Sequence, residues 1–503
     1  MKKQITRLLA LTLCVAMLLA LVGCGGKKAS DEEVIYLSLE ADPLHLDESL
    51  SLATTTRWSA GPVNDYLFAF DEDMNLEKRL VEEYNMADEL TLELKIREGV
   101  KFHNGREVKA SDVKFSIERQ LDETVASEIA YNFTCIDSVE VVDDYSAIVH
   151  LNEPYASLLT KLARIAIVPE ECADTLKTAP VGCGPFKFVE WKHDQSIELE
   201  AFEDYWQEGY PKADRLIFKI LPEYNSQRAA LMAGEIDILT WLNSNDVAEL
   251  ENNEKVKVNS IDIQDAYYVL LNCDVEPFND PLVRKAISLA IDKQTCLDVT
   301  MAGYGDVLHA PVPSSSYYFD DSLKFERDVE KAKELLAEAG YADGFTCKLV
   351  TPQTAVEGPL GDLIQAQLAE VGITVEVEKM EVNAYLDKTF AKRDFEIMVC
   401  GDSGDGDPET LAYSYLFGQS PNNLGNYQNP EFDQLMTEGR ATYDPELRRE
   451  IYLKAFTLLM EDSPMTFLFG GKIYQGLAKD IEGFAGDTTQ RYIYEGVYRN
   501  SGE

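Results

Sequence analysis

The segment from Gly401 to Gly404 reads Gly-Asp-Ser-Gly, the arrangement found around the nucleophile of one class of serine hydrolases. A serine nucleophile needs a histidine base within hydrogen-bonding distance and a carboxylate that orients this histidine. The chain has 5 histidines, and none stands in the histidine motif of that class. They are His45, His103, His150, His193 and His309. We therefore interpret the match as a chance occurrence and keep a serine hydrolase only as an alternative.

The acidic run from Asp402 to Glu409 carries the oxygen ligands that calcium prefers. In an EF-hand loop starting at Asp405, glycine would stand at position 410, where this chain has threonine. A solvated acidic turn is therefore the favoured interpretation. The chain also lacks His-Glu-x-x-His, a Walker loop and a dinucleotide fingerprint. The sequence predicts no metal, no cofactor and no catalytic residue, so the protein is not expected to be an enzyme.

The first residues have the order of an export signal. Lys2, Lys3 and Arg7 precede an apolar run over residues 8–21, which is too short for a comfortable membrane span of roughly 20 residues. The run ends in Leu-Val-Gly-Cys at Cys24, which resembles a bacterial lipobox. This resemblance implies a signal peptide over 1–23, a lipid on Cys24 and a tether over 24–33. An ordinary secretory signal is the alternative, and either reading predicts an extracytoplasmic protein.

Length, net charge and cysteine content limit the possible domain organisation, binding partners and metal or disulfide sites. A chain of 503 residues exceeds the usual limit for a single core, so two or three domains are expected. The net charge of −43 repels nucleic acid and bare anionic membranes. Beyond Cys14 and Cys24 the chain has an odd number of cysteines and no Cys-x-x-Cys, so neither a disulfide scaffold nor a structural zinc is indicated.

Strand and helix patterns alternate along the chain, which predicts an α/β fold. Apolar residues alternate with polar ones from Leu90 to Ile96 and from Leu216 to Ile220, as expected of half-buried strands. Asp280 and Pro281 form a strong helix start, and the apolar residues up to Ile291 recur at helical spacing.

Longer segments of the chain share an order and spacing with a known family. The segments are residues 97–116, 180–191, 277–293 and 429–464. They include Arg97-Glu98-Gly99-Val100, Gly182-Cys183-Gly184-Pro185, Phe278-Asn279-Asp280-Pro281 and Asn429-Pro430-Glu431-Phe432. In these segments the chain resembles the family 5 extracellular solute-binding proteins, which are the oligopeptide- and dipeptide-binding proteins of ABC importers. One departure is Cys183, where the family usually has threonine.

The resemblance implies a bilobed, periplasmic-binding-protein-like clamp of class II (cluster C) with an extra inserted domain. The implied boundaries are 34–55, 180–264 and 473–503 for lobe I, 56–179 for the inserted domain and 265–472 for lobe II. Two hinge strands would let the lobes close over a ligand. The Gly182-x-Gly184 turn is expected to need permissive backbone before a strand of lobe I.

The same resemblance implies a ligand site. Peptide-binding members hold the ligand's amino group with an aspartate shortly before an Asp-Pro pair. The matching stretch runs from Cys400 through Gly401 to Asp402, ahead of Asp407-Pro408, with Val399 where tryptophan is common. Asp402 is the candidate amine anchor, and Asp405 is its rival. The turn holding Ala41 and Asp42 is expected to face the cleft. Trp58 and Tyr474 are further possible cleft residues, although core packing is favoured for both.

The predicted function is binding rather than catalysis. A lipid-anchored receptor would capture peptides and deliver them to the membrane permease of an ABC importer, and the receptor itself is expected to be a monomer. Residues 351–361 contain no Lys or Arg, so a tight dipeptide clamp is disfavoured against a longer peptide or another solute. The alternatives are an oligosaccharide, a metal–chelate complex, a sensory role or a secreted serine hydrolase.

Overall fold

A computed structural model describes most of the chain after residue 31. The described residues are 32–51, 53–70, 76–263, 265–314, 316–404, 407–418, 420, 423–487 and 490–500. The predicted signal peptide, Cys24 and Asp405 lie outside these residues. None of the helices in the described ranges combines the length and the apolar character needed to cross a membrane.

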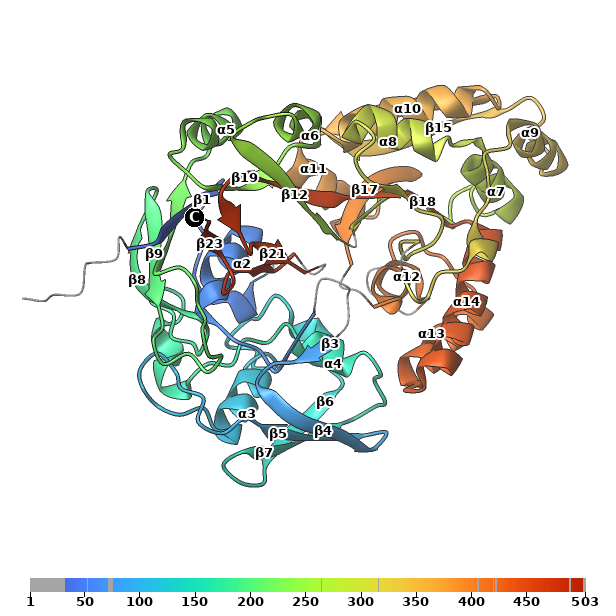
Figure 1. The fold of residues 1–503 in the computed structure, drawn as a ribbon. Helices are drawn as coiled ribbons and strands as arrows, with labels where there is room; N and C mark the ends of the chain where they lie inside the picture. Colours follow the sequence, from blue (N-terminus) through green and yellow to red (C-terminus); the bar gives the residue numbers. More distant parts are fainter. Residues whose placement is uncertain are drawn as a thin grey trace, which may run out of the picture.

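The first large sheet combines five strands from residues 186–262 with β1 near the start of the chain and β19 near its end (Figure 1). In spatial order its strands are β12 (Val256–Asp262), β19 (Lys472–Ala478), β11 (Ile238–Leu242), β1 (Val34–Leu39), β10 (Arg215–Ile220), β9 (Ser196–Ala201) and β8 (Phe186–Lys192). Strand β1 is parallel to β10 and β11. Because side chains alternate along β10, Leu216 and Phe218 enter the core. This sheet, with α5 (Tyr224–Ala233) and α6 (Ser244–Glu251), is here named the first lobe.

A separate layer is inserted between β1 and β8, in blue and teal in Figure 1. Its antiparallel sheet has the order β4 (Val81–Asp88), β5 (Thr91–Ile96), β7 (Ser146–Leu151) and β6 (Ile136–Val141). The predicted alternation is confirmed for Leu92, Leu94 and Ile96, which are buried, whereas Leu90 precedes the strand and is exposed. The other elements of this inserted layer are β2 (Phe68–Phe70), β3 (Leu76–Lys78), α3 (Ala110–Glu118) and α4 (Leu158–Leu162). Helix α2 (Thr54–Ala60) precedes them and packs Trp58 and Ala60 into the core of the first lobe.

The second lobe is built around another mixed sheet. Its order is β14 (Asp306–Val307), β18 (Met465–Gly470), β13 (Asp265–Leu271), β17 (Ile397–Ser403), β15 (Phe345–Pro352) and β16 (Ile373–Met380). Its helices are α7 (Pro281–Ala290), α8 (Lys293–Met301), α9 (Val329–Glu338), α10 (Glu357–Ala369), α11 (Val382–Leu386), α12 (Glu409–Leu416), α13 (Pro430–Ala441) and α14 (Pro445–Asp462).

Helix α7 forms for the local reasons that the sequence indicates. The side chain of Asp280 accepts a hydrogen bond from the backbone N–H of Leu282, and Pro281 occupies the first turn, where no N–H is needed. Val283 and Ile287 lie on the buried face of the helix. The predicted helix is therefore confirmed.

The Gly182-x-Gly184 turn needs glycine for a different reason from the one expected. Neither glycine has a positive φ. A Cβ atom on Gly184 would stand 2.4 Å from the carbonyl oxygen of Asn64, and one on Gly182 would stand 2.2 Å from that of Val63. Close backbone approach to the segment before β2, and not conformational freedom, excludes larger residues here.

The chain passes between the lobes where strands of the two large sheets follow each other directly. Strand β12 ends at Asp262 and β13 begins at Asp265, while β18 ends at Gly470 and β19 begins at Lys472. The two pairs of strands are antiparallel partners on both sides of the passage. A Cβ on Gly470 would lie 2.8 Å from the carbonyl oxygen of Asp265, so the connections pack closely.

After β19 the C-terminal segment folds back along the first lobe. It pairs β20 (Ile481–Glu482) with β23 (Tyr498–Arg499), and β21 (Ala485–Gly486) with β22 (Tyr492–Ile493). The hydroxyl of Tyr494 donates a hydrogen bond to the carbonyl oxygen of Trp58 at 2.9 Å, which joins the end of the chain to α2.

Candidate functional site

Asp402 is the residue before the last one of strand β17 and lies beside the passage between the lobes. It pairs with Ala266, whose neighbour Asp265 is the first residue of β13. The Asp402 carboxylate is half-buried and accepts a hydrogen bond from the hydroxyl of Tyr415 in α12. A carboxylate in this setting can form a strong charge-assisted hydrogen bond to a cation.

Cys400 and Gly401 precede Asp402 on the same strand, and neither side chain is reactive. Cys400 is buried opposite Tyr268, and burial raises the pKa of its thiol to about 12. A thiol in that state is a poor nucleophile. A Cβ on Gly401 would stand 2.7 Å from the ring of Tyr267, so this position accepts only glycine without movement of that ring.

Ala41 and Asp42 lie on the turn that follows β1. Ala41 is exposed. The Asp42 carboxylate accepts a hydrogen bond from the indole N–H of Trp191 at 2.8 Å and lies 2.9 Å from Nδ1 of His193. Both partners belong to the β8 edge of the first sheet, which is opposite the edge that adjoins the passage. Within the described residues no contact brings Asp42 to Asp402.

Tyr474 and Trp58 both pack in the interior. Tyr474 of β19 is 7% exposed, and its ring meets that of Tyr304 from the second lobe edge-on at 5.4 Å between centroids. Trp58 of α2 stacks on Tyr492 at 4.9 Å and donates from its indole N–H to the carbonyl oxygen of Gln490 at 3.1 Å. Core packing, the interpretation favoured for both residues, accounts for these contacts.

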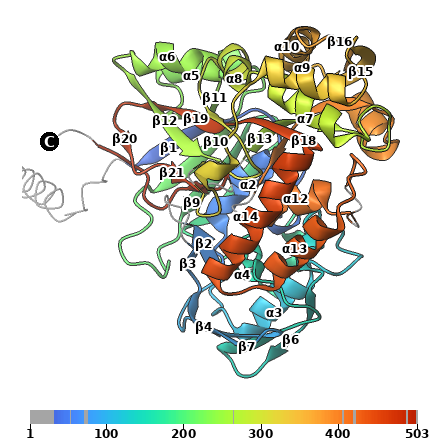
Figure 2. The ribbon, with the colours of Figure 1, turned by 90° about the vertical axis from the view of Figure 1, so that its right-hand side faces the viewer.

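Asp407, of the Asp-Pro pair after Asp402, takes part in a buried polar contact between the second lobe and the inserted layer. Figure 2 shows α13 and α14 of the second lobe near α4 of the inserted layer. Both oxygens of Asp407 accept from Nη2 of Arg448 at 3.0 Å, and the same nitrogen donates to Oγ of Ser157 at 2.8 Å. The hydroxyl of Tyr155 donates to Oε1 of Glu409 at 2.7 Å. Burial raises the pKa of Glu409. This contact holds α12 and α14 against the inserted layer.

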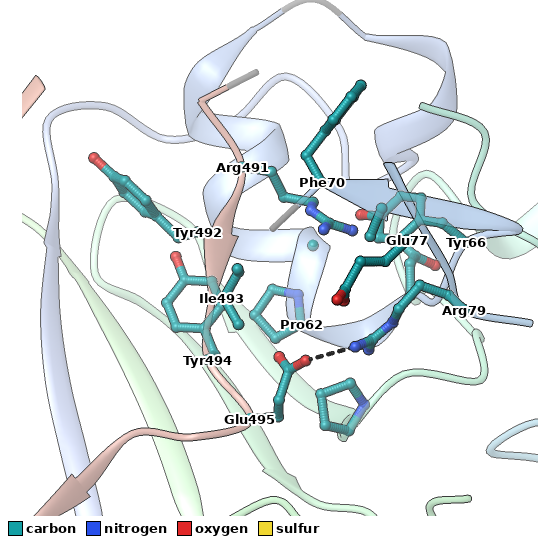
Figure 3. Close-up of a pocket in the computed structure, with 14 residues that line it drawn as sticks. Pro62, Tyr66, Phe70, Glu77, Arg79, Arg491, Tyr492, Ile493, Tyr494 and Glu495 are labelled. Carbon is teal, nitrogen blue, oxygen red and sulfur yellow. Dashed lines mark ion pairs between the residues drawn. The ribbon is translucent and has the colours of Figure 1, made fainter. Parts of the chain in front are cut away.

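A cavity of about 410 Å³ lies between the inserted layer and the C-terminal segment (Figure 3). Tyr66 and Arg79 line one side, and Arg491, Tyr492 and Glu495 line the other. Arg79 and Glu495 form an ion pair at 3.1 Å across it.

None of the predicted site residues lines this cavity. Its residues come from segments more than 400 positions apart, which sequence spacing alone does not bring together. The available signal was the pair Tyr492 and Tyr494, which stand at alternate positions between the charged residues Arg491 and Glu495.

In the described part of the chain, neither the cysteines nor groups of possible metal ligands add a further site. The cysteines in the described residues are free thiols: Cys135, Cys172, Cys183, Cys273, Cys296, Cys347 and Cys400. Over the same ranges, His, Cys, Asp and Glu side chains form no group of three or more that could hold a metal ion.

Comparison with known proteins gives a consistent assignment. The model of the bacterial extracellular solute-binding proteins, family 5, matches residues 75–424. The chain is 31% identical over 479 residues to heme-binding protein A of Haemophilus influenzae, covering 87% of each chain. It is 29% identical over 460 residues to the glutathione-binding protein GsiB of Pectobacterium atrosepticum, covering 88% of each.

A solved structure agrees with these relatives. The ABC transporter-associated periplasmic binding protein DppA of Helicobacter pylori, in complex with the peptide STSA, superposes with a TM-score of 0.77 at 29% identity. The match covers 93% of this chain and 98% of that one. The predicted fold class, a bilobed α/β clamp of the periplasmic-binding-protein type, is confirmed.

Proposed function

Because this chain belongs to the bacterial extracellular solute-binding proteins of family 5, we propose that it is the lipid-anchored peptide receptor of an ABC importer. Members of this family are substrate-binding transport proteins and not enzymes. The receptor captures a peptide between its lobes and delivers it to the permease in the membrane. The predicted domain boundaries, the lipid on Cys24 and the monomeric state are parts of this proposal.

The position of Asp402 is the observation that carries the peptide assignment. The carboxylate stands beside the passage between the lobes, where closure would surround a ligand that it holds. A peptide presents an ammonium group at its N-terminus, and a half-buried carboxylate is the partner that such a cation requires. The Tyr415 hydroxyl orients the carboxylate through its hydrogen bond.

Two of the relatives support a peptide ligand. The name of one specifies glutathione and that of the other a peptide, so the same fold accepts peptides with different side chains. Main-chain hydrogen bonds to an extended peptide would give that tolerance, because every peptide presents the same backbone groups.

A non-peptide solute is the second candidate, and the heme-binding relative at 31% identity favours it. An oligosaccharide or a metal–chelate complex would belong to the same class of alternatives. For these ligands Asp402 would have no amine to hold. The two candidates therefore differ in whether the Asp402 charge contributes to affinity.

A thermal-shift screen of the purified protein tests the proposal. The panel contains di-, tri- and longer peptides, glutathione, heme, oligosaccharides, and nickel with and without histidine. A ligand at 100 times its dissociation constant adds about 2.7 kcal/mol to the stability of the native state, which gives a clear shift. Stabilisation by peptides supports the proposal. Stabilisation confined to heme, sugars or nickel complexes would overturn the peptide assignment.

A further inference from the structure

One short segment of the inserted layer makes polar contacts with three helices of the second lobe. The segment is residues 155–161, which lead into α4 and form most of it. Its partners lie at the start of α12, at the end of α13 and in the first turns of α14. Two parts of the molecule that are more than 240 residues apart in the chain therefore meet at one place.

Backbone groups of the segment take part in this contact. The N–H of Ala156 donates a hydrogen bond to the carbonyl oxygen of Arg440 at 2.7 Å. The N–H of Tyr155 donates to the hydroxyl of Tyr443 at 3.2 Å, and this hydroxyl donates to the carbonyl oxygen of Glu89 at 3.0 Å. Hydrogen bonds of the backbone fix the position of the whole segment, and not only of its side chains, against the second lobe.

The side chains of the segment are buried by the second lobe and find their partners there. Tyr155, Ser157 and Lys161 are only 4%, 1% and 3% exposed. Nζ of Lys161 donates to Oγ1 of Thr410 at 3.3 Å, and the guanidinium of Arg440 lies over the ring of Tyr155 at 4.8 Å. Buried polar groups are costly unless they are hydrogen-bonded, so these side chains depend on the second lobe being in contact.

The two sides of the contact are connected through the passage between the lobes. The inserted layer leaves the first lobe after β1 and returns to it at β8. The chain enters the second lobe from β12 to β13 and leaves it from β18 to β19. Hinge motion at these connections would separate residues 155–161 from α12, α13 and α14, so the contact belongs to the closed arrangement of the lobes.

The same contact is linked to the candidate amine anchor. Glu409, which accepts from the hydroxyl of Tyr155, is the first residue of α12. Tyr415 of this helix donates to the carboxylate of Asp402. One helix therefore carries both a residue that orients the anchor and a residue that joins the second lobe to the inserted layer.

From these observations we propose that residues 155–161 are a latch, which engages α12, α13 and α14 and holds the lobes closed over the ligand. This inference rests on the proposed peptide function and adds a control of release, because the latch must open before the peptide leaves. The contacts described above join groups of the protein to each other. The latch therefore contributes to the closed arrangement with and without a peptide.

Hydrogen exchange of the protein without added peptide tests the latch itself. Tyr155→Phe combined with Ser157→Ala removes two hydroxyls and keeps the ring beneath Arg440. In the closed arrangement Glu409 and Arg448 each lose a hydrogen bond, whereas water satisfies both in the open one. Exchange over residues 155–161, measured by mass spectrometry, should become at least about ten-fold faster in the double variant.

Two controls separate opening of the latch from unfolding. Tyr131→Phe changes a tyrosine of the same layer that is 62% exposed, and it should leave exchange over residues 155–161 unchanged. Strand β5, in the core of the inserted layer, should exchange as slowly in the double variant as in the unmodified protein. Equally faster exchange in β5 would mean that the layer unfolds as a whole, which overturns a latch that opens by itself.

Release of peptide tests the control that the latch exerts. The probe is an equimolar mixture of random tripeptides, and its dissociation is followed by tryptophan fluorescence after rapid dilution. The double variant should release the mixture at least about ten-fold faster than the unmodified protein, and Tyr131→Phe should release it at the unmodified rate.

The possible failures are distinguishable from each other. Unchanged exchange over residues 155–161 in the double variant overturns the latch. Faster exchange with an unchanged rate of release overturns its control of release. Failure of the tripeptides to bind the unmodified protein overturns the peptide function, and the exchange experiment, which uses no peptide, still decides whether the latch exists.

Discussion

The hydroxyl of Tyr415 in α12 donates a hydrogen bond to the carboxylate of Asp402 in β17. Helix α12 begins at Glu409, which receives a hydrogen bond from Tyr155 of the inserted layer. The candidate amine anchor is thus connected through one short helix to the contact between the second lobe and the inserted layer. A ligand bound to Asp402 would therefore be connected, through Tyr415 and α12, to the contact between these two parts of the molecule.

Removal of the Asp402 charge should weaken peptide binding selectively. Asp402→Asn keeps the shape of the side chain, and we expect peptides with a free amino terminus to bind about 10- to 100-fold more weakly, as for the loss of one charged hydrogen bond. Calorimetry with free and N-acetylated forms of the same peptide measures the effect. Asp42→Asn is the matched control, because Asp42 is engaged by Trp191 and His193. Equal loss for both peptide forms would rule out the amine anchor.

The lipid on Cys24 is tested in cells. Cys24→Ser removes the thiol that would carry the acyl chains, and two chains are needed for firm attachment to a membrane. The variant should move from the membrane fraction to the soluble extracytoplasmic fraction, as measured by immunoblotting after fractionation. Cys135→Ser, at a buried thiol of the inserted layer, is the control. Retention of Cys24→Ser in the membrane fraction would contradict the lipid anchor.

The sequence predicted those helices and strands that depend on residues close to one another in the chain. Helix α7 follows from Asp280, Pro281 and the apolar spacing, and these act within one or two turns. The position of Asp42 could not be predicted in this way, because its partner Trp191 is 149 residues away and turns the carboxylate toward β8.

The same limit explains the missed cavity. Arg79 and Glu495 line it from distant parts of the chain, and only the folded chain brings them together. The shared motifs identified the family through turns and packing, such as the close approach of Gly184 to Asn64. Motifs of that kind specify a fold and contain little information on the ligand.

The buried ion pair of Asp407 and Arg448 should stabilise the native state. In Asp407→Asn the Arg448 guanidinium stays buried without its counter-charge, and such changes usually cost about 3–5 kcal/mol. Urea unfolding followed by tryptophan fluorescence measures the loss. Asp362→Asn breaks the exposed pair with Lys379 and should change the unfolding midpoint little. Similar midpoints for the two variants would show that the buried pair contributes no more than a surface pair.

The imidazole of His103 should make the protein less stable in mild acid. His103 lies between the backbone groups of Gly184 and Gly182, with Nε2 at 2.9 Å from the Gly184 carbonyl oxygen. Burial lowers the pKa of His103 from 6.5 to about 4. The unfolded chain therefore binds a proton at a higher pH than the folded one, so the stability that neutral His103 contributes is complete above pH 6.5 and is lost as the pH falls toward 4.

Comparison with a variant isolates this contribution. Between pH 7 and pH 4.5 the unmodified protein should lose about 2 kcal/mol more than His103→Gln, because glutamine does not titrate. The pKa of His309 is also lowered to about 4 by burial, but that residue is present in both proteins and cancels in the difference. His193→Gln, at an exposed histidine, should retain the full dependence on pH. Parallel stability curves for the unmodified protein and His103→Gln would contradict a neutral, buried imidazole at this turn.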